Sequence, residues 1–233
     1  MERSKAFGTA LASILLGGGA LALAGYALAS ASPHQAALVC QATTTGNCTL
    51  AISSFPDSLA GEHGKTGGAH PDWVSYSNDN LVAPANTTVT MTISQYDSGG
   101  ALNNKAFFGR VWGTVGGTAT IATPNTAGTS YTTATVTKVD GSNVGHTFTL
   151  RGVPGNGSPL FVSVPLPASP STNSITVGDA QYGSPVKVTF SFKTGGPGVY
   201  EWNCEYPCGG SREGQFGFAM SSYGYMSGTL TVK

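Results

Sequence analysis

Short runs of alternating hydrophobic and polar residues dominate the chain from Trp73 onward. In VKVTFSF, residues 186–192, every second side chain is Val or Phe, and TVTMTIS at residues 88–94 alternates in the same way. A period of two residues is typical of a strand with one buried face. Similar β-type runs cover residues 81–84, 107–122, 130–140, 146–150, 159–167, 198–204 and 228–233.

The spacing of these runs predicts the fold class. Turn residues separate them about every dozen positions, which indicates an all-β domain built as a Greek-key β-sandwich or barrel over residues 73–233. Residues 32–72 are rich in Ser, Gly, Ala, His and Pro and show little periodicity. We expect this segment to be an irregular tether or cap.

The N-terminal 31 residues carry an export signal. Residues 1–5, MERSK, have a small positive excess, and residues 6–29 contain no charge. That length suffices for one hydrophobic helix across a bilayer, which needs roughly 20 apolar residues. Ala29-Ser30-Ala31 also fits a signal-peptide cleavage site. A retained membrane anchor and a cleaved signal peptide both remain open, and both place the rest of the chain outside the cytoplasm, in the periplasm or at the cell surface.

Composition narrows the classes of function. Only 9% of the 233 residues are charged, and 11 basic residues balance 11 acidic ones, so no nucleic-acid partner is expected. The chain has no G-x-S-x-G motif and few acids, which argues against a hydrolytic enzyme. Cys40 and Cys48 bracket the polar loop QATTTGN. In an oxidising compartment they are expected to form a local disulfide.

The remaining cysteines lie in a pattern typical of a redox metal site. Cys204 and Cys208 stand four residues apart in YEWNCEYPCGG, at the end of an expected strand, and Met226 precedes the last strand. His146 begins an earlier strand, whereas His34, His63 and His70 lie in the irregular segment. Soft thiolate and thioether ligands suit copper. Zinc would require four well-placed ligands.

The sequence runs HTFTL, VPLP, PVKVTFSFKTGGPGVYEWNCEYPCG and GYMSGTLTV resemble the cupredoxin superfamily, and within it the copper-bearing domain of cytochrome c oxidase subunit II. This resemblance implies that His146, Cys204, Cys208 and Met226 are metal ligands and that copper is the cofactor. It also implies electron transfer in a respiratory-type chain, with a redox partner or oxidase subunits. On this interpretation the chain is an electron-transfer or accessory domain rather than a catalyst on its own.

One departure from the family pattern matters. The family uses a second histidine a few residues before the methionine, but here Tyr223 precedes Met226 and no histidine follows His146. A normal binuclear copper centre is therefore not expected. Three interpretations stay open: a mononuclear copper site, a metal-free structural or binding β-sandwich closed by a Cys204–Cys208 disulfide, and two free thiols or another metal such as zinc. The metal-free sandwich would serve as an accessory subunit or a cell-surface module.

Overall fold

The computed structural model describes residues 36–43, 46–98, 109–152, 158–206, 208 and 218–233. The chain divides into residues 1–34 and a compact unit, residues 35–233. The expected signal peptide or membrane anchor at residues 1–31 lies outside the described residues. Within the described ranges, no helix is long and apolar enough to cross a membrane. Helical structure in those ranges consists of the short 3-10 helices η1 (Gly64–Thr66), η2 (Val115–Gly117) and η3 (Ala219–Ser221).

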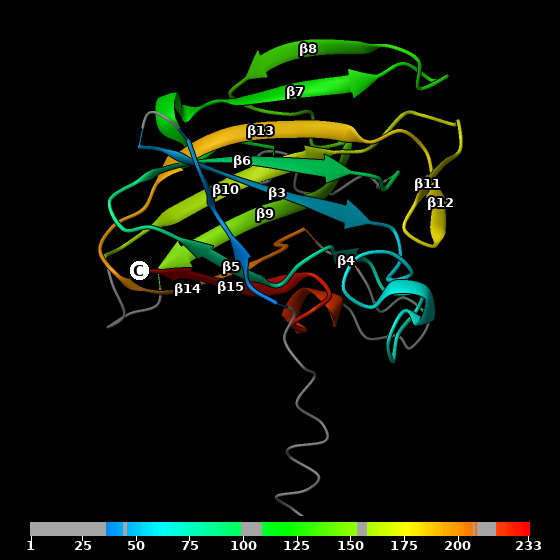
Figure 1. Ribbon diagram of the computed structural model, residues 1–233. Helices are drawn as coiled ribbons and strands as arrows, with labels where there is room; N and C mark the ends of the chain where they lie inside the picture. The colour runs from blue at the N-terminus through cyan, green and yellow to red at the C-terminus, as the bar shows by residue number, and fades with distance from the viewer. Residues whose placement is uncertain (1–35, 44–45, 99–108, 153–157, 207, 209–217) are drawn as a thin grey trace, which may run out of the picture. The chain divides into compact units, whose positions relative to one another are not determined.

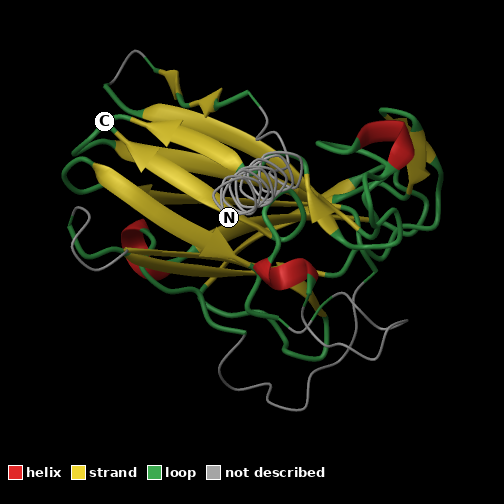
Figure 2. Ribbon diagram, turned by 90° about the horizontal axis from the view of Figure 1, so that it is seen from below, coloured by secondary structure: helices red, strands yellow, loops and turns green. Residues whose placement is uncertain are grey.

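Two mixed β-sheets form the compact unit, and Figure 1 shows them as two layers. The first sheet has the order β1 (Leu38–Val39), β5 (Asn80–Ala83), β15 (Ser227–Val232), β14 (Gly198–Asn203), β9 (Val144–Gly152) and β10 (Phe161–Pro167). The second has the order β2 (Gln41–Ala42), β3 (Cys48–Phe55), β6 (Thr88–Gln95), β13 (Val186–Lys193), β7 (Ala119–Pro124) and β8 (Tyr131–Val136), and β4 (Ser75–Tyr76) pairs with β3. A separate hairpin joins β11 (Ile175–Val177) to β12 (Ala180–Tyr182). Figure 2 shows the strands side by side from below.

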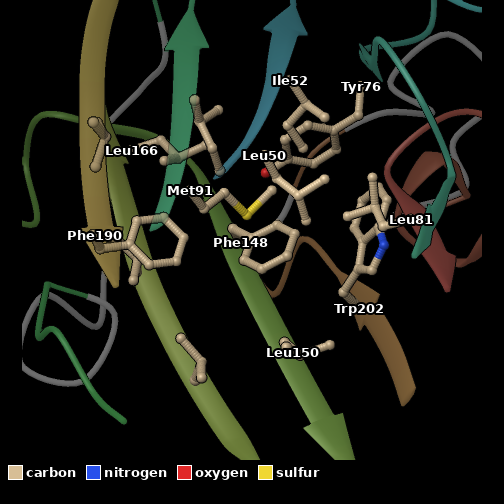
Figure 3. Close-up of a cluster of buried hydrophobic side chains, with 14 of the residues drawn as sticks. Leu50, Ile52, Tyr76, Leu81, Met91, Phe148, Leu150, Leu166, Phe190 and Trp202 are labelled. Atoms are coloured by element: carbon tan, nitrogen blue, oxygen red, sulfur yellow. The ribbon is translucent and has the colours of Figure 1, made fainter. Parts of the chain in front are cut away.

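Alternating side chains from both sheets fill the space between the layers. Phe148 of β9 lies 5.9 Å from Phe190 of β13, measured between ring centroids, and 5.4 Å from Trp202 of β14 (Figure 3). Tyr76 meets Trp202 edge to face at 5.0 Å. Burying each such side chain contributes roughly 1.5–3 kcal/mol. This aromatic core holds the two sheets together.

The expected all-β sandwich is confirmed. Each β-type run after Trp73 contains a strand, although in the run 107–122 the strand β7 begins only at Ala119. Sequential strands often lie in different sheets, as Greek-key connections require: β5 belongs to the first sheet, whereas β6 belongs to the second. The short strands β4, β11 and β12 were not predicted.

The prediction for residues 32–72 was wrong in one important respect. This segment contains β3, an eight-residue strand that pairs in parallel with β6 from Cys48↔Val89 to Ser54↔Gln95. Its side chains at Cys48, Leu50 and Ile52 are buried and alternate with the exposed Thr49 and Ala51, so this strand also has one buried face. The sandwich therefore begins near residue 38 instead of Trp73. The predicted disulfide between Cys40 and Cys48 is confirmed.

Candidate metal centre

Three of the four predicted ligands meet at one end of the sandwich. The imidazole of His146 and the sulfurs of Cys204 and Cys208 offer ligand atoms that all lie within 4.8 Å of one another. The Cys204 Sγ atom is 3.8 Å from His146 Nδ1. His146 and Cys204 are buried, whereas Cys208 is partly exposed. His146 lies far from the two cysteines in the sequence, and the pairing of β9 with β14 brings it beside them.

The period of the strands explains why these side chains point inward. In β14, Trp202 faces the core, and Cys204 follows two residues later, so its side chain leaves the backbone on the same side. In β9, His146 precedes the core residue Phe148 by two positions. The register Trp202↔Leu150 and Asn203↔Thr149 then brings the end of β14 beside the start of β9. Each strand therefore delivers one ligand to the same interior corner.

Met226, the fourth predicted ligand, lies opposite Cys204. The β14–β15 register pairs Asn203 with Ser227, and one position further the Cys204 N–H donates to the Met226 carbonyl at 2.9 Å. Residues that oppose each other across an antiparallel pair place their side chains on the same face. Met226 is fully buried. Its thioether therefore leaves the backbone on the same face of the sheet as the Cys204 sulfur.

Hydrogen bonds stabilise the Cys204 sulfur as a thiolate. The Thr147 N–H donates to Cys204 Sγ at 3.4 Å, and the Thr147 hydroxyl lies 4.0 Å away. Burial raises the pKa of the Cys204 thiol, but hydrogen bonds to Cys208 and His146, the charge of His146 and the Thr147 N–H together hold that pKa well below its usual value. A thiolate is the form of cysteine that binds metals.

An acid that the sequence analysis did not single out orients His146. The Nε2 atom of His146 lies 2.9 Å from the Asp97 carboxylate, which leaves Nδ1 directed toward Cys204. Burial lowers the pKa of His146, but the hydrogen bonds to Asp97 and Cys204 outweigh it and raise that pKa to about 9. Without a metal, a protonated imidazole thus lies between a carboxylate and a thiolate. A metal ion can take the place of the proton on Nδ1.

The expected alternative of a Cys204–Cys208 disulfide does not agree with the structure, in which both residues are free thiols. A hydrogen bond to Cys204 raises the pKa of the Cys208 thiol well above its usual value, and burial adds to this effect. These opposite pKa shifts favour a proton on Cys208 over one on Cys204. This arrangement satisfies both side chains without a covalent bond.

Tyr223, which stands where the family pattern has its second histidine, does not face this corner. Its side chain is 42% exposed and hydrogen-bonds to Glu201, an exposed residue of β14. Glu201 and the inward-facing Trp202 are neighbours in a strand, so they point to opposite faces of the sheet. Tyr223 therefore covers the outer face of the sheet and lies away from the candidate ligands.

Two histidines of residues 32–72, His63 and His70, contact the chain just before Met226, and His34 lies outside the described residues. The His63 ring stacks on Tyr225 at 4.3 Å between centroids, and its Nε2 atom lies 3.0 Å from the Gly224 carbonyl. His70 stacks on Trp73 at 3.7 Å, and its backbone N–H donates to the Tyr225 hydroxyl at 3.2 Å. Neither belongs to the metal-competent group found among the described residues. Their role here is to pack against the segment that carries Met226.

The donor set fits a soft metal. Two sulfurs, one imidazole nitrogen and a nearby thioether suit copper, and the same sulfur and nitrogen ligands also occur in zinc sites. A structural zinc site normally has four closed ligands of the N, S or carboxylate type, and three are brought together here. A methionine beside a Cys–His pair is typical of copper electron-transfer sites. The residues present therefore fit copper better than zinc.

No protein-family model matches the chain, and no curated protein matches it in sequence. Among solved structures, reduced rusticyanin is similar at 14% identity, with 89% of this chain and 93% of that chain covered and a TM-score of 0.33. Rusticyanin from Thiobacillus ferrooxidans has 14% identity, coverages of 84% and 82%, and a TM-score of 0.32. Auracyanin B has 16% identity, coverages of 79% and 88%, and a TM-score of 0.30. The resemblance to oxidase subunit II stays a prediction.

Proposed function

We propose that this protein binds one copper ion through His146 and Cys204, with Cys208 or Met226 completing the ligand set, and that it transfers electrons. The observation that carries the proposal is the gathering of one imidazole nitrogen and two cysteine sulfurs within 4.8 Å at a largely buried corner. A purely structural corner of a sandwich has no need of a thiolate hydrogen-bonded to a buried histidine.

Electron transfer suits this site better than substrate chemistry. Copper, when bound, supplies a one-electron couple. The chain contributes a Cys204 sulfur held by the Thr147 N–H and a His146 ring held by Asp97. Ligands fixed by a rigid sandwich rearrange little when the metal changes charge. Catalysis on a substrate would require an open coordination position, and burial of His146 and Cys204 argues against one.

The proposed setting is extracytoplasmic. The Cys40–Cys48 disulfide supports an oxidising compartment such as the periplasm or cell surface. If residues 1–31 are retained as a membrane anchor, the copper domain would stay near the membrane, where a redox partner or oxidase subunit of a respiratory-type chain would exchange electrons with it.

The experiment is metal analysis with an optical spectrum on the full chain, produced with copper, beside its Cys204→Ser variant. We expect about one copper per chain and a strong thiolate-to-copper charge-transfer band that the variant lacks. The Cys40→Ser and Cys48→Ser double variant is the matched control, since it also removes cysteine sulfur but leaves the candidate ligands intact. A colourless, copper-free protein would refute the proposal.

The second candidate is a metal-free binding or accessory sandwich. The outward direction of Tyr223 favours it, because the position expected to hold a second imidazole carries no ligand toward the site. In that case the wild type and Cys204→Ser would both lack copper, and partner binding would be the property to measure. Stoichiometric zinc without colour would identify the third interpretation.

A further inference from the structure

We propose that Asp97 is a positioning residue of the metal centre: its carboxylate fixes the ring of His146 so that Nδ1, and not Nε2, is offered to the metal. This inference rests on the proposed copper function. Asp97 lies two residues after the end of β6, a strand of the second sheet, whereas His146 is the third residue of β9 in the first sheet. The hydrogen bond between them joins the two sheets at the site.

Hydrogen bonds hold the backbone of Asp97 at both its N–H and its carbonyl. Its N–H donates to the side-chain carbonyl of Gln95 at 3.2 Å, and its own carbonyl accepts from the Ser169 N–H at 2.9 Å. Gln95 is fully buried. The Asp97 carboxylate therefore approaches His146 from an anchored backbone, and its Oδ2 atom reaches Nε2 at 2.9 Å.

The chemistry of imidazole explains what this contact does. A histidine ligand has two nitrogens, and a hydrogen bond on one determines which of them is left for the metal. Here Nε2 donates to the carboxylate, and Nδ1 lies 3.8 Å from the Cys204 sulfur. Without Asp97, the ring could rotate about its side-chain bonds, and the nitrogen facing Cys204 would no longer be fixed.

A carboxylate also adds negative charge to the ligand. The Asp97 side chain is only 17% exposed and the His146 side chain 1%, so water screens this charge poorly. A more electron-rich imidazole binds Cu(II) better, and negative charge near the metal favours the higher oxidation state. Asp97 is therefore expected to increase copper affinity and to lower the reduction potential. These two effects distinguish it from a residue that only stabilises the fold.

The test compares the full chain with Asp97→Asn and Asp97→Ala, and uses Asp179→Asn as the matched control. Asp179 is exposed in the β11–β12 turn and pairs with Lys65 at 3.8 Å, so this variant makes the same charge change away from the site. Affinities for Cu(I) and Cu(II) are measured against a competing chelator, and the midpoint potential by optical titration. In the metal-free proteins, NMR follows solvent exchange of the His146 Nε2 proton.

We expect Asp97→Ala to lower copper affinity 10- to 100-fold, as is typical of residues that orient metal ligands. Asp97→Asn retains an acceptor oxygen and should lower copper affinity about tenfold, mostly for Cu(II). A tenfold preferential loss of Cu(II) affinity raises the midpoint potential by about 59 mV, since a one-electron couple shifts by that amount per tenfold. The Nε2 proton should exchange slowly in the wild type and in Asp97→Asn, and quickly in Asp97→Ala.

The inference is overturned if both Asp97 variants match Asp179→Asn in copper affinity and potential. Should Asp97→Ala fail to fold, the affinity and potential of Asp97→Asn decide the matter. If the wild type itself binds no copper, the proposed function fails, and exchange of the Nε2 proton then tests Asp97 alone. Exchange in the wild type as fast as in Asp97→Ala would overturn its positioning role.

Discussion

Copper binding should release protons, because the metal and a proton compete for His146 Nδ1. The contacts of His146 with Asp97 and Cys204 raise its pKa to about 9, whereas the Cys204 thiol is held as a thiolate. At neutral pH the metal-free site therefore carries one proton that a copper ion must displace. If Cys208 also binds as a thiolate, its raised pKa means that a second proton leaves.

The size of the effect follows from the pKa of His146. At pH 7 the imidazole lies two units below a pKa of about 9. Displacing its proton then weakens the apparent copper affinity by about 100-fold, or about 2.7 kcal/mol at about 1.36 kcal/mol per unit. Affinity should thus increase about tenfold per pH unit between pH 6 and 9 if one proton leaves, and about 100-fold per unit if two leave. Above pH 9 the contribution of His146 should level off.

The assay is a Cu(I) titration without oxygen, against a competing chelator at pH 6, 7, 8 and 9. Calorimetry in buffers of different ionisation enthalpy counts the protons directly. Cys208→Ser is the matched variant, since it removes the second thiol but leaves the His146–Cys204 pair intact. If both proteins release one proton per copper, Cys208 is not a ligand. If the wild type releases two protons and Cys208→Ser releases one, Cys208 is a ligand. An affinity that stays constant from pH 6 to 9, with no proton released, would refute the assigned ionisation of the site.

Three further predictions concern the scaffold. Replacing both Cys40 and Cys48 with serine should lower the free energy of unfolding by about 2.5 kcal/mol, the loop-entropy value for a separation of eight residues. Urea denaturation measures this change, and an unchanged midpoint would contradict it. Tyr223→His should leave the copper spectrum unaltered, because this side chain faces Glu201 on the outer face of the sheet, and a new nitrogen ligand detected by electron paramagnetic resonance would show that reasoning wrong. Trp73→Ala should lower the free energy of unfolding by roughly 3–5 kcal/mol, because Trp73 is buried and packs against Tyr225, just before Met226. The variant should also lose copper to a chelator faster, and equal rates of copper loss in the variant and the wild type would contradict this role.

The sequence predicted those parts of the fold in which one strand carries a clear period of two. The strand β13 buries the side chains of Val186, Val188, Phe190 and Phe192 as the pattern indicated. The strand β3 was missed because it lies in a segment poor in large hydrophobic residues, and its inward face also includes the polar Ser54. Pairing with β6 determines that strand, and such pairing depends on residues far away in the chain.

The candidate site could be predicted only in part. The spacing of Cys204, Cys208 and Met226 around two strand ends identified the corner, and resemblance to a family added His146. The role of Asp97 could not be predicted, because no spacing relates it to His146 and only the stacking of the two sheets brings them together. Sequence also left the state of the two cysteines open, whereas the structure shows both without a disulfide, and their hydrogen bond raises the pKa of the Cys208 thiol.

The disulfide between Cys40 and Cys48 has a consequence for oxidative folding. Four cysteines can pair in three ways, and two of these would take Cys204 away from its place beside His146. Cys40 and Cys48 are close in sequence, and they emerge first from an N-to-C synthesis and export, so their short loop closes at low entropic cost. Once they are joined, Cys204 and Cys208 have only each other as partners within the chain. Early closure of one hairpin thus protects the thiols of a distant site from scrambling.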